Sequence, residues 1–549
     1  MDVSQAVLER LTAAGIDTVF GIPGKQTLPL NEAIDRRDDV RFVLARHETA
    51  VTHQAWGYAE TSGRPAATVV VPGPGDMNAM NGLKNACNDC TPLVHLAVET
   101  DPEIRGGDGI HETPLETYDT VVKTNRLVER PERTAAVLEE AIAVAETPPK
   151  GPVRVGIPKS FLSMDVSLAA TGTYSRTSVT DVPETALESA VDLLADADEP
   201  VVVVGGGVRS ANASDDLRRV ADRLGAPVVT TYKGKGVLPD GDGGPVAGTL
   251  SGSAAPELLA TLAEADAALA VGTDFDAVAT RAWSVDVPET LVHVTLEADD
   301  LATGYEPTVG IVADAGTALT ALEDALADRG LEPRPDDAVE RAAAVREATS
   351  ERLAPLRTSS PPLPSVSALE AVREGVPREA IVAADAGGFR VWGLNVFEAT
   401  GPRSYVNPGS WATMGTGLPS GIGAQCANPD ADVVVLTGDG GLMMCVHELH
   451  TIVAEALPLT VVVFVNEDYA IISDEADRTY DLEAGAYGWG ETPIDFEGLA
   501  SSFGLRADRA ETPSAIQETL ESAVAADEPV LVAIPTDPEE PQAGDWMQS

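Results

Sequence analysis

Basic residues are scarce in this chain, and that scarcity excludes some classes of binding partner. Its 549 residues include 37 lysines and arginines against 87 aspartates and glutamates, a formal net charge of −50 at pH 7. So acidic a surface repels nucleic acid and anionic membranes, and we expect neither as a partner. The acidic residues are spread along the chain rather than collected in a tail. This pattern favours a protein of a salt-rich cytoplasm, where screening weakens self-repulsion.

Cysteines and long apolar runs are scarce as well. Four cysteines give no disulfide framework. Cys87 and Cys90 form a Cys-x-x-Cys, but Cys426 and Cys445 are isolated, so small apolar helix residues are a better interpretation than a redox or zinc site. No apolar stretch approaches the length of a membrane span, and residues 1–5 lack the features that begin a signal peptide. These features indicate a cytoplasmic protein.

Strand-like apolar runs alternate with helical segments throughout the chain, which is too long for a single core. The alternation is typical of parallel βα units, whose sites lie at the carboxyl ends of strands. We therefore expect an α/β fold with three doubly wound parallel-sheet domains, at residues 1–168, 182–328 and 365–540. Residues 169–181, rich in Thr and Ser, and residues 329–364, rich in Pro and charge, are predicted linkers, the second containing a helix.

The most informative motif lies in the third domain. Residues 433–436 form an apolar run typical of a buried parallel strand, and a Gly-Asp-Gly-Gly turn follows at 438–441. Glycines at such a turn let backbone N–H groups approach a diphosphate, and the N-terminus of the next helix favours its negative charge. A second strand, 460–465, ends at Asn466. Asp439 and Asn466 offer the hard oxygen ligands that Mg²⁺ prefers.

This arrangement resembles the thiamine diphosphate motif, and further segments match the same enzymes in order and spacing. The matching segments are Arg46-His47-Glu48, Gly73-Pro74-Gly75, Lys123-x-Asn125, Gly205-Gly206-Gly207, Gly234-Lys235-Gly236 and Thr413-Met414-Gly415. The chain is therefore identified as a member of the superfamily of thiamine diphosphate enzymes that contains acetolactate synthase, pyruvate decarboxylase and benzaldehyde lyase. It most resembles the large subunit of acetolactate synthase, and its charge favours a haloarchaeal source.

The resemblance implies thiamine diphosphate and Mg²⁺ as cofactors. The metal ligands would be the side chains of Asp439 and Asn466 and the backbone carbonyl of Asp468, while Val465 replaces an asparagine of the family pattern. The residues that would hold the organic cofactor are Pro23, Gly24, Glu48, Gly387, Gly388, Met414, Asp439, Gly440, Gly441 and Asn466. The family builds this site between two chains, Glu48 from one and Asp439 with Asn466 from the other. The resemblance thus implies at least a homodimer.

Two residues are implied in catalysis. Glu48 stands where the family keeps the carboxylate that exchanges a proton with the aminopyrimidine ring, and an ordinary helix-N-terminal glutamate is the other interpretation. His111 is the best candidate for a substrate-side acid or base because imidazole titrates near neutrality, although a core or surface histidine fits equally well. Met414 would bend the bound cofactor, or would be a plain core methionine.

The substrate and the reaction are less determined than the cofactor. Ile472 replaces the glutamate that assists protonation in pyruvate decarboxylases, and His111 is not followed by a second histidine. Both departures favour an acetolactate synthase-like carboligase acting on small 2-oxo acids. Glu475 and the pair Thr273-Asp274, however, replace the tryptophan and the flavin-contacting arginine of the synthases, so FAD is doubtful. The alternatives are a non-ligating 2-oxo acid decarboxylase or hydroxyketone lyase, and a binding protein on a degenerate scaffold.

Four further residues invite a ligand interpretation. Lys233 and Lys235 lie in a Gly-rich turn, where they would meet a nucleotide phosphate or face solvent. His447 and His450 flank Glu448, but their spacing lacks the His-Glu-x-x-His frame of a metal site, and we expect them on a helix surface.

Overall fold

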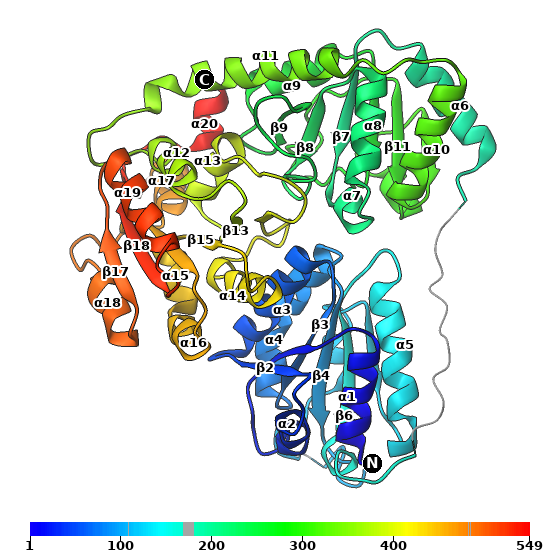
Figure 1. Cartoon of the computed structure of the whole chain (residues 1–549), viewed down its shortest axis with the longest axis vertical. Helices are drawn as coiled ribbons and strands as arrows, with labels where there is room; N and C mark the ends of the chain where they lie inside the picture. Colours follow the sequence, from blue (N-terminus) through cyan, green and yellow to red (C-terminus); the bar gives the residue numbers. More distant parts are fainter. Residues whose placement is uncertain (108, 168–180, 481, 484, 549) are drawn as a thin grey trace.

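Three six-stranded parallel sheets form the chain, as predicted (Figure 1). The computed structural model describes residues 1–107, 109–167, 181–480, 482–483 and 485–548. The predicted end of the first domain at residue 168 and the predicted linker up to residue 180 lie outside these ranges. The proposed limits 182–328 and 365–540 bracket the second and third sheets.

The first sheet has the strand order β2-β1-β3-β4-β6-β5, and its pairings are parallel. Its strands are β1 (Thr18–Gly21), β2 (Arg41–Leu44), β3 (Ala66–Val70), β4 (Leu93–Glu99), β5 (Thr124–Leu127) and β6 (Val153–Pro158). Its helices are α1 (Val3–Ala13), α2 (Leu28–Asp35), α3 (Glu48–Ser62), α4 (Pro74–Asn88) and α5 (Thr134–Glu146). Every residue of β3 and β4 is buried, since helices cover both faces of a parallel sheet.

The third sheet repeats this topology with the order β14-β13-β15-β16-β18-β17. Its strands are β13 (Ile381–Ala384), β14 (Tyr405–Val406), β15 (Val433–Gly438), β16 (Thr460–Val465), β17 (Arg506–Arg509) and β18 (Val530–Pro535). Its helices are α12 (Ser365–Gly375), α13 (Gly388–Val396), α14 (Gly417–Ala427), α15 (Asp439–Cys445), α16 (Leu449–Ala454), α17 (Ala470–Tyr480), α18 (Phe496–Phe503), α19 (Pro513–Val524) and α20 (Ala543–Gln548). The valine runs of β15 and β16 explain why these two strands lie at the centre of the sheet.

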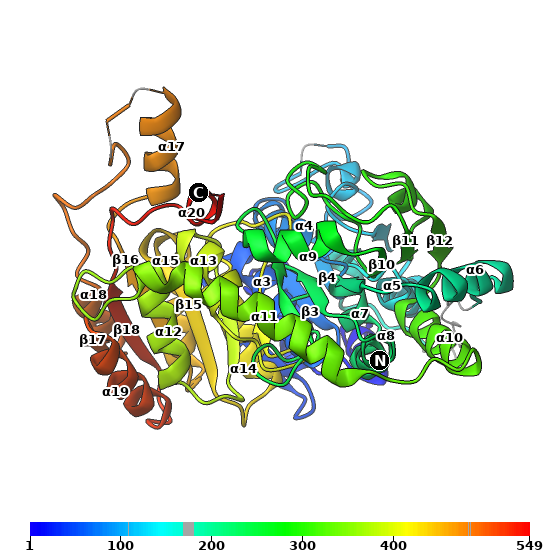
Figure 2. The ribbon, with the colours of Figure 1, turned by 90° about the horizontal axis from the view of Figure 1, so that it is seen from above.

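The middle sheet has a different order, β12-β11-β10-β7-β8-β9. Its strands are β7 (Pro200–Val204), β8 (Val228–Thr231), β9 (Val246–Leu250), β10 (Ala267–Val271), β11 (Leu291–Thr295) and β12 (Val309–Val312). Its helices are α6 (Glu184–Ala195), α7 (Gly206–Ser210), α8 (Ser214–Leu224), α9 (Pro256–Glu264) and α10 (Ala315–Asp328). The helix expected in the second linker is α11 (Pro335–Leu353), which runs from the middle domain toward the C-terminal domain (Figures 1 and 2).

The first and third domains pack together through α3 and α14, which lie side by side in Figure 1. Their backbones touch at two glycines: a Cβ on Gly57 would overlap the backbone of Ser420, and one on Gly423 would overlap the carbonyl oxygen of Gln54. A single apolar core therefore runs from Val51 in one domain into the other. The start of α3 and the loop before α14 are fixed relative to each other.

A buried ionic cluster joins all three domains. The Glu60 carboxylate accepts from Arg209 at 2.7 Å and from Lys233 at 3.0 Å, and Lys233 also pairs with Asp89 at 3.1 Å. Arg403 of the third domain donates to the carbonyl oxygen of Glu60 at 3.0 Å. The Lys233 ammonium is thus paired with carboxylates and largely shielded from solvent, so the prediction that it faces solvent is wrong, because its partners come from distant segments. The residue also lines the cavity at the Gly205-Gly206-Gly207 turn, and a contact with a phosphate there stays a prediction.

Among the helices that the structure describes, none combines the length and the apolar character needed to cross a bilayer.

Candidate active site

The site residues predicted in the third domain meet in one cavity of about 320 Å³. The predicted residues that line it are Gly387, Gly388, Met414, Asp439, Gly440, Gly441, Asn466 and Asp468. They come from the carboxyl ends of β13, β15 and β16 and from the loop before α14. The chain passes to opposite sides of the sheet after β13 and β15, so the cavity lies at the topological switch point where such sheets bind ligands.

Asp439 is a buried carboxylate held by backbone. Its Oδ1 accepts from the N–H of Gly440 at 2.8 Å, and its Oδ2 accepts from the N–H of Glu467 at 2.7 Å. Burial raises the pKa of this carboxyl to about 6, against the effect of these hydrogen bonds. A cation beside it would offset the cost of burying the charged form, so the group fits the position of a metal ligand.

Asn466 and Asp468 follow β16, line the same cavity and flank Glu467, whose N–H donates to Asp439. The N–H of Asp468 donates to Asn466 Oδ1 at 3.3 Å, and Ser473 donates to Asp468 Oδ1 at 2.6 Å. The Asp468 side chain is thereby engaged within the protein, which is compatible with a ligand role for its backbone carbonyl. Within the described residues, no group of three or more His, Cys, Asp or Glu side chains could hold a metal. The predicted set, with one carboxylate, one amide and one carbonyl, does not depend on such a group.

The glycines of the turn stand where a side chain would not fit. A Cβ on Gly440 would fall 2.6 Å from the ring of Tyr469 and 3.4 Å from the terminal methyl of Met414. A Cβ on Gly441 would fall 2.6 Å from Asp385 Oδ2. Protein atoms occupy the places that these side chains would take, so the turn keeps bare backbone, as a cradle for a diphosphate requires. On both its donor set and its shape, the cavity fits thiamine diphosphate with Mg²⁺.

The site residues predicted in the first domain gather around a second turn, residues 72–75. Glu48 is the first residue of α3, and its Oε2 accepts from Asn78 Nδ2 at 3.1 Å. A Cβ on Gly75 would lie 3.1 Å from Glu48 Oε1. Gly24, next to Pro23, packs against Val71, where a Cβ would overlap the Val71 side chain.

His111 reaches the same turn from its other side. A Cβ on Gly73 would fall 2.5 Å from the carbonyl oxygen of His111, whose backbone has a φ of 66°. Its Nδ1 is buried and has no hydrogen-bond partner among the described residues. None of Pro23, Gly24, Glu48 and His111 lines the third-domain cavity. A single chain thus presents the two predicted halves of the site separately.

Two carboxylates at the third-domain site escaped the sequence reasoning. Asp385 is fully buried, and it accepts from the N–H groups of Gly415 and Thr416 at 3.1 Å and from Thr437 Oγ1 at 2.9 Å. It therefore fixes the loop that carries Met414, and its place directly after the strand β13 could have indicated it. Glu540 lines the cavity itself, and burial raises its pKa to about 7. No pattern in the C-terminal segment marks it.

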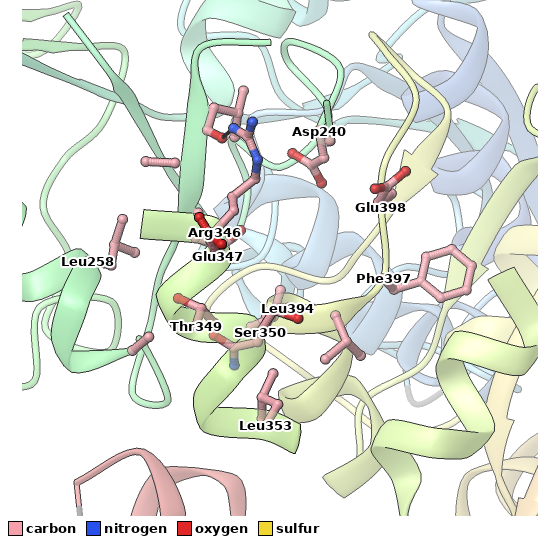
Figure 3. A pocket seen from close by; sticks show the side chains of 18 of the residues that line it. Asp240, Leu258, Arg346, Glu347, Thr349, Ser350, Leu353, Leu394, Phe397 and Glu398 are labelled. Carbon is pink, nitrogen blue, oxygen red and sulfur yellow. Dashed lines mark hydrogen bonds between the residues drawn. The ribbon is translucent and has the colours of Figure 1, made fainter. Parts of the chain in front are cut away.

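Two other cavities contain none of the predicted site residues. One, of about 490 Å³, lies where α11 meets the middle and third domains, and Figure 3 shows Asp240, Arg346 and Glu398 around it. Lys235 belongs to its wall, but its side chain is buried and pairs with Asp240 at 2.6 Å, so it does not face solvent. This cavity is the larger one, but the glycine turn and the oxygen donors mark the smaller one as the cofactor site.

The other cavity, of about 360 Å³, lies at the carboxyl ends of the middle-sheet strands and includes the Gly205-Gly206-Gly207 turn. Asp274, Asp276 and Asp300 line it. Burial raises the pKa of Asp274, and the charges of Asp276 and Asp300 raise it further. The crowding of carboxylates at this point does not fit the diphosphate of a flavin dinucleotide.

Comparisons with known proteins agree with this geometry. Residues 1–119 match the thiamine pyrophosphate enzyme N-terminal TPP binding domain, residues 187–322 the central domain, and residues 385–534 the C-terminal TPP binding domain. The chain is 29% identical to a probable acetolactate synthase large subunit of Methanocaldococcus jannaschii, over 98% of this chain and 93% of that protein. It is 31% identical to a probable chloroplastic acetolactate synthase 2 of Oryza sativa subsp. japonica, over 96% of this chain and 82% of that protein.

A chloroplastic acetolactate synthase of Arabidopsis thaliana is also 31% identical, over 86% of this chain and 71% of that protein. The chain belongs to the thiamine pyrophosphate (thiamine diphosphate) enzyme family, in agreement with the resemblance found in the sequence.

Proposed function

We propose that this enzyme is a carboligase of the acetolactate synthase type. It would decarboxylate a small 2-oxo acid and transfer the remaining acyl group to a second carbonyl compound. The observation that carries the proposal is that Asp439, Asn466 and Asp468 line one cavity together with the glycine turns. The names of the similar proteins, acetolactate synthases from an archaeon and from plants, support the carboligase assignment.

Each group of the predicted site residues would have its own role in this reaction. Mg²⁺, which offsets the diphosphate charge, would be held by Asp439, Asn466 and the Asp468 carbonyl. The backbone cradle for the diphosphate would be formed by Gly387, Gly388, Gly440 and Gly441. When bound, thiamine diphosphate supplies the electron sink that allows carbon dioxide to leave a 2-oxo acid. Glu48 would hold and return a proton at its carboxylate, against the aminopyrimidine of the cofactor.

The reaction that follows decarboxylation depends on the rest of the cavity wall. Ile471 and Ile472 line it, so an apolar surface stands where the pyruvate decarboxylases place a protonating glutamate. An apolar wall disfavours early protonation and leaves the acyl group available to a second carbonyl. His111 is the proposed group for proton transfer on the substrate side, because its Nδ1 is buried without a partner among the described residues.

A homodimer is the proposed assembly, because each chain offers the halves of the site separately. Large apolar side chains are exposed beside both halves: Met443, Met444, Ile471 and Ile472 near the cavity, and Met77 and Ile110 near the Glu48 turn. The helix α17, which carries Ile471 and Ile472, projects away from the rest of the chain (Figure 2). A second copy that covers these surfaces would bring its Glu48 to the cavity of the first.

The compartment is proposed from charge. A net charge of −50 suits a salt-rich cytoplasm, in which the ions screen the repulsion within and between the chains.

Product identification tests the function. The full chain, supplied with thiamine diphosphate and Mg²⁺ in molar salt, is incubated with a panel of small 2-oxo acids, alone and with acceptor carbonyl compounds. We expect 2-hydroxy-3-oxo acids, in which the acyl group left after one 2-oxo acid loses carbon dioxide is joined to C2 of a second 2-oxo acid. Aldehyde as the sole product would assign the enzyme to the decarboxylases, and cleavage of hydroxyketones without 2-oxo acid turnover would assign it to the lyases.

A further inference from the structure

Glu448 is a fully buried carboxylate in the third domain. It ends a short 3₁₀ turn (Val446–Glu448) that continues α15 directly, so one helical segment leads from Asp439 at its start to Glu448. Its Oε2 accepts from Thr451 Oγ1 at 2.6 Å and from Gln54 Nε2 at 3.0 Å. Gln54 belongs to α3, so the carboxylate already reaches into the first domain.

The second oxygen of Glu448 holds the start of α3. Oε1 accepts from the backbone N–H of Arg46 at 2.8 Å and from that of His47 at 3.0 Å. These two residues immediately precede Glu48, and His47 is the N-cap of α3. The Arg46 side chain is held by the same domain, since its Nε donates to His450 Nδ1 at 2.8 Å. The backbone that aims Glu48 is thus bound from outside its own domain.

The chemistry of these contacts explains why a carboxylate is present. A buried charge is costly unless it is paired or hydrogen-bonded, and no Lys or Arg side chain pairs with Glu448 in the described parts of the chain. His447 Nε2 lies 3.6 Å from Glu448 Oε1, but burial lowers the pKa of this imidazole and disfavours its charged form. The stabilisation of Glu448 comes from four hydrogen-bond donors, two of which are the backbone groups that open α3. Charge-assisted hydrogen bonds of this kind are among the strong ones, and they fix direction as well as distance.

We propose that Glu448 is a positioning residue for Glu48: it anchors the first turn of α3 to the helical segment that begins at the metal-binding Asp439. The inference rests on the proposed function, because it takes Glu48 as the proton-exchanging group. It adds a mechanical connection between the two halves of the site that one chain carries. Cofactor binding at Asp439 and the orientation of Glu48 are then linked within each chain.

Amide exchange tests the anchor without any turnover. In the full chain, with and without cofactor, hydrogen–deuterium exchange is measured for peptides that cover residues 44–49. Glu448→Ala should speed exchange at the amides of Arg46 and His47, while peptides from the middle domain remain unchanged. The matched control is Thr451→Val, which removes one contact to Oε2 but leaves both backbone contacts. Unchanged protection in a folded Glu448→Ala protein, or equal loss in the control, would overturn the proposal.

A double-mutant cycle tests whether Glu448 acts through Glu48. The readouts are turnover and exchange of the C2 hydrogen of bound cofactor, which needs no substrate. Glu448→Ala should slow both by roughly 10²-fold, the typical cost of misplacing a catalytic group by about 1 Å, and leave cofactor affinity nearly unchanged. In the Glu48→Gln background the same change should add no further loss. If the losses from the two changes multiply instead, Glu448 acts independently of Glu48. That result would show a merely structural role for Glu448 and refute the inference.

Two arrangements keep the test decisive. If the Glu448→Ala protein fails to fold, Glu448→Gln replaces it, because the glutamine keeps one oxygen for the backbone N–H groups. Where both variants fold, Glu448→Gln should retain more amide protection and more turnover than Glu448→Ala. If wild type forms no product from any 2-oxo acid and Glu48→Gln leaves C2 exchange unchanged, the proposed function fails. If wild type is active and Glu48→Gln is inactive, but Glu448 shows no coupling, only the inference fails.

Discussion

The two carboxylates that the proposed mechanism uses are held in different ways. Asp439 has both oxygens bound by backbone N–H groups and is buried, whereas Glu48 is half-buried and accepts one hydrogen bond through Oε2, from Asn78. A rigid, fully ordered carboxylate suits a metal ligand, and a carboxylate with an oxygen to spare suits a group that must exchange a proton.

The first residue-scale prediction concerns that exchange. Glu48→Gln should bind thiamine diphosphate with near wild-type affinity but lose roughly 10²–10⁴-fold in kcat, because an amide cannot cycle the proton. Cofactor affinity by titration and initial rates in molar salt measure the two effects. A variant that keeps more than about a tenth of wild-type kcat would remove Glu48 from the mechanism.

A second residue-scale prediction concerns the metal. Asp439→Ala should weaken Mg²⁺-dependent cofactor binding by more than roughly 10–100-fold, the usual cost of losing only an outer-shell partner of a metal. Asp468→Asn is the matched control, because the proposed ligand at that position is the backbone carbonyl and an asparagine still accepts from Ser473. Cofactor retention after dialysis in Mg²⁺ measures both variants. Equal affinity in wild type and Asp439→Ala would show that the motif is misassigned.

At the scale of single residues, the sequence indicates functional residues that stand next to a recognisable local pattern, but it does not indicate contacts between residues far apart in the chain. Asp439 and Asn466 stand out because each follows an apolar strand, and the cavity does contain both. Lys233 is not predicted by the same reasoning: its neighbours in sequence are Tyr232 and Gly234, while its ion-pair partners Glu60 and Asp89 lie far away along the chain. Glu448 is a similar case, since the N–H groups that it accepts belong to another domain.

At the scale of elements, the pair α3 and α14 determines how the first and third domains meet. Gly57 and Gly423 allow backbone contact, and a side chain at Gly423 would overlap the carbonyl oxygen of Gln54. The strands and the alternation of helices follow from apolar runs in the sequence. The pairing of α3 with α14 could not be predicted in this way, because it depends on where two glycines of different domains come to lie.

The close contact makes an element-scale prediction. Gly423→Ala should lower the free energy of unfolding by about 1–3 kcal/mol or more, since neither backbone can give way without separating the helices. Gly252→Ala is the control, because no atom lies within 4 Å of a Cβ at that position. Denaturant unfolding in high salt compares the two variants. Equal midpoints would show that the helices adjust at no cost.

The middle domain gives a second prediction at this scale. Asp274, Asp276 and Asp300 crowd the carboxyl ends of its strands, and Tyr232 donates to Asp276 at 2.5 Å. Carboxylates there repel a dinucleotide diphosphate, so we expect the purified protein to contain no stoichiometric FAD. The absorption spectrum of freshly purified protein decides the matter. One flavin per chain would contradict the prediction and would favour a synthase of the flavin-containing type.

At the scale of the whole molecule, charge acts in two opposite ways. Inside, opposite charges hold the domains together: burial alone would raise the pKa of Glu60, but Arg209 and Lys233 outweigh it and keep the pKa below its usual range. The group therefore stabilises the fold above the pKa of an unfolded glutamate, and that contribution is lost as the pH falls through the depressed folded-state value. Outside, the excess of carboxylates opposes compaction and assembly.

The last prediction follows from the outer charge. A net charge of −50 on each chain should hinder the proposed dimer wherever screening is weak. The Debye length falls from about 10 Å at 0.1 M salt to about 3 Å at 1 M, so repulsion across the interface should largely vanish over that range. Activity and dimer content should therefore rise together with salt and fall together on dilution, because Glu48 of one chain is proposed to serve the cavity of the other. Light scattering and initial rates on the same samples measure both. A stable, fully active dimer at about 0.1 M salt would show that the acidic surface is not an adaptation to high salt.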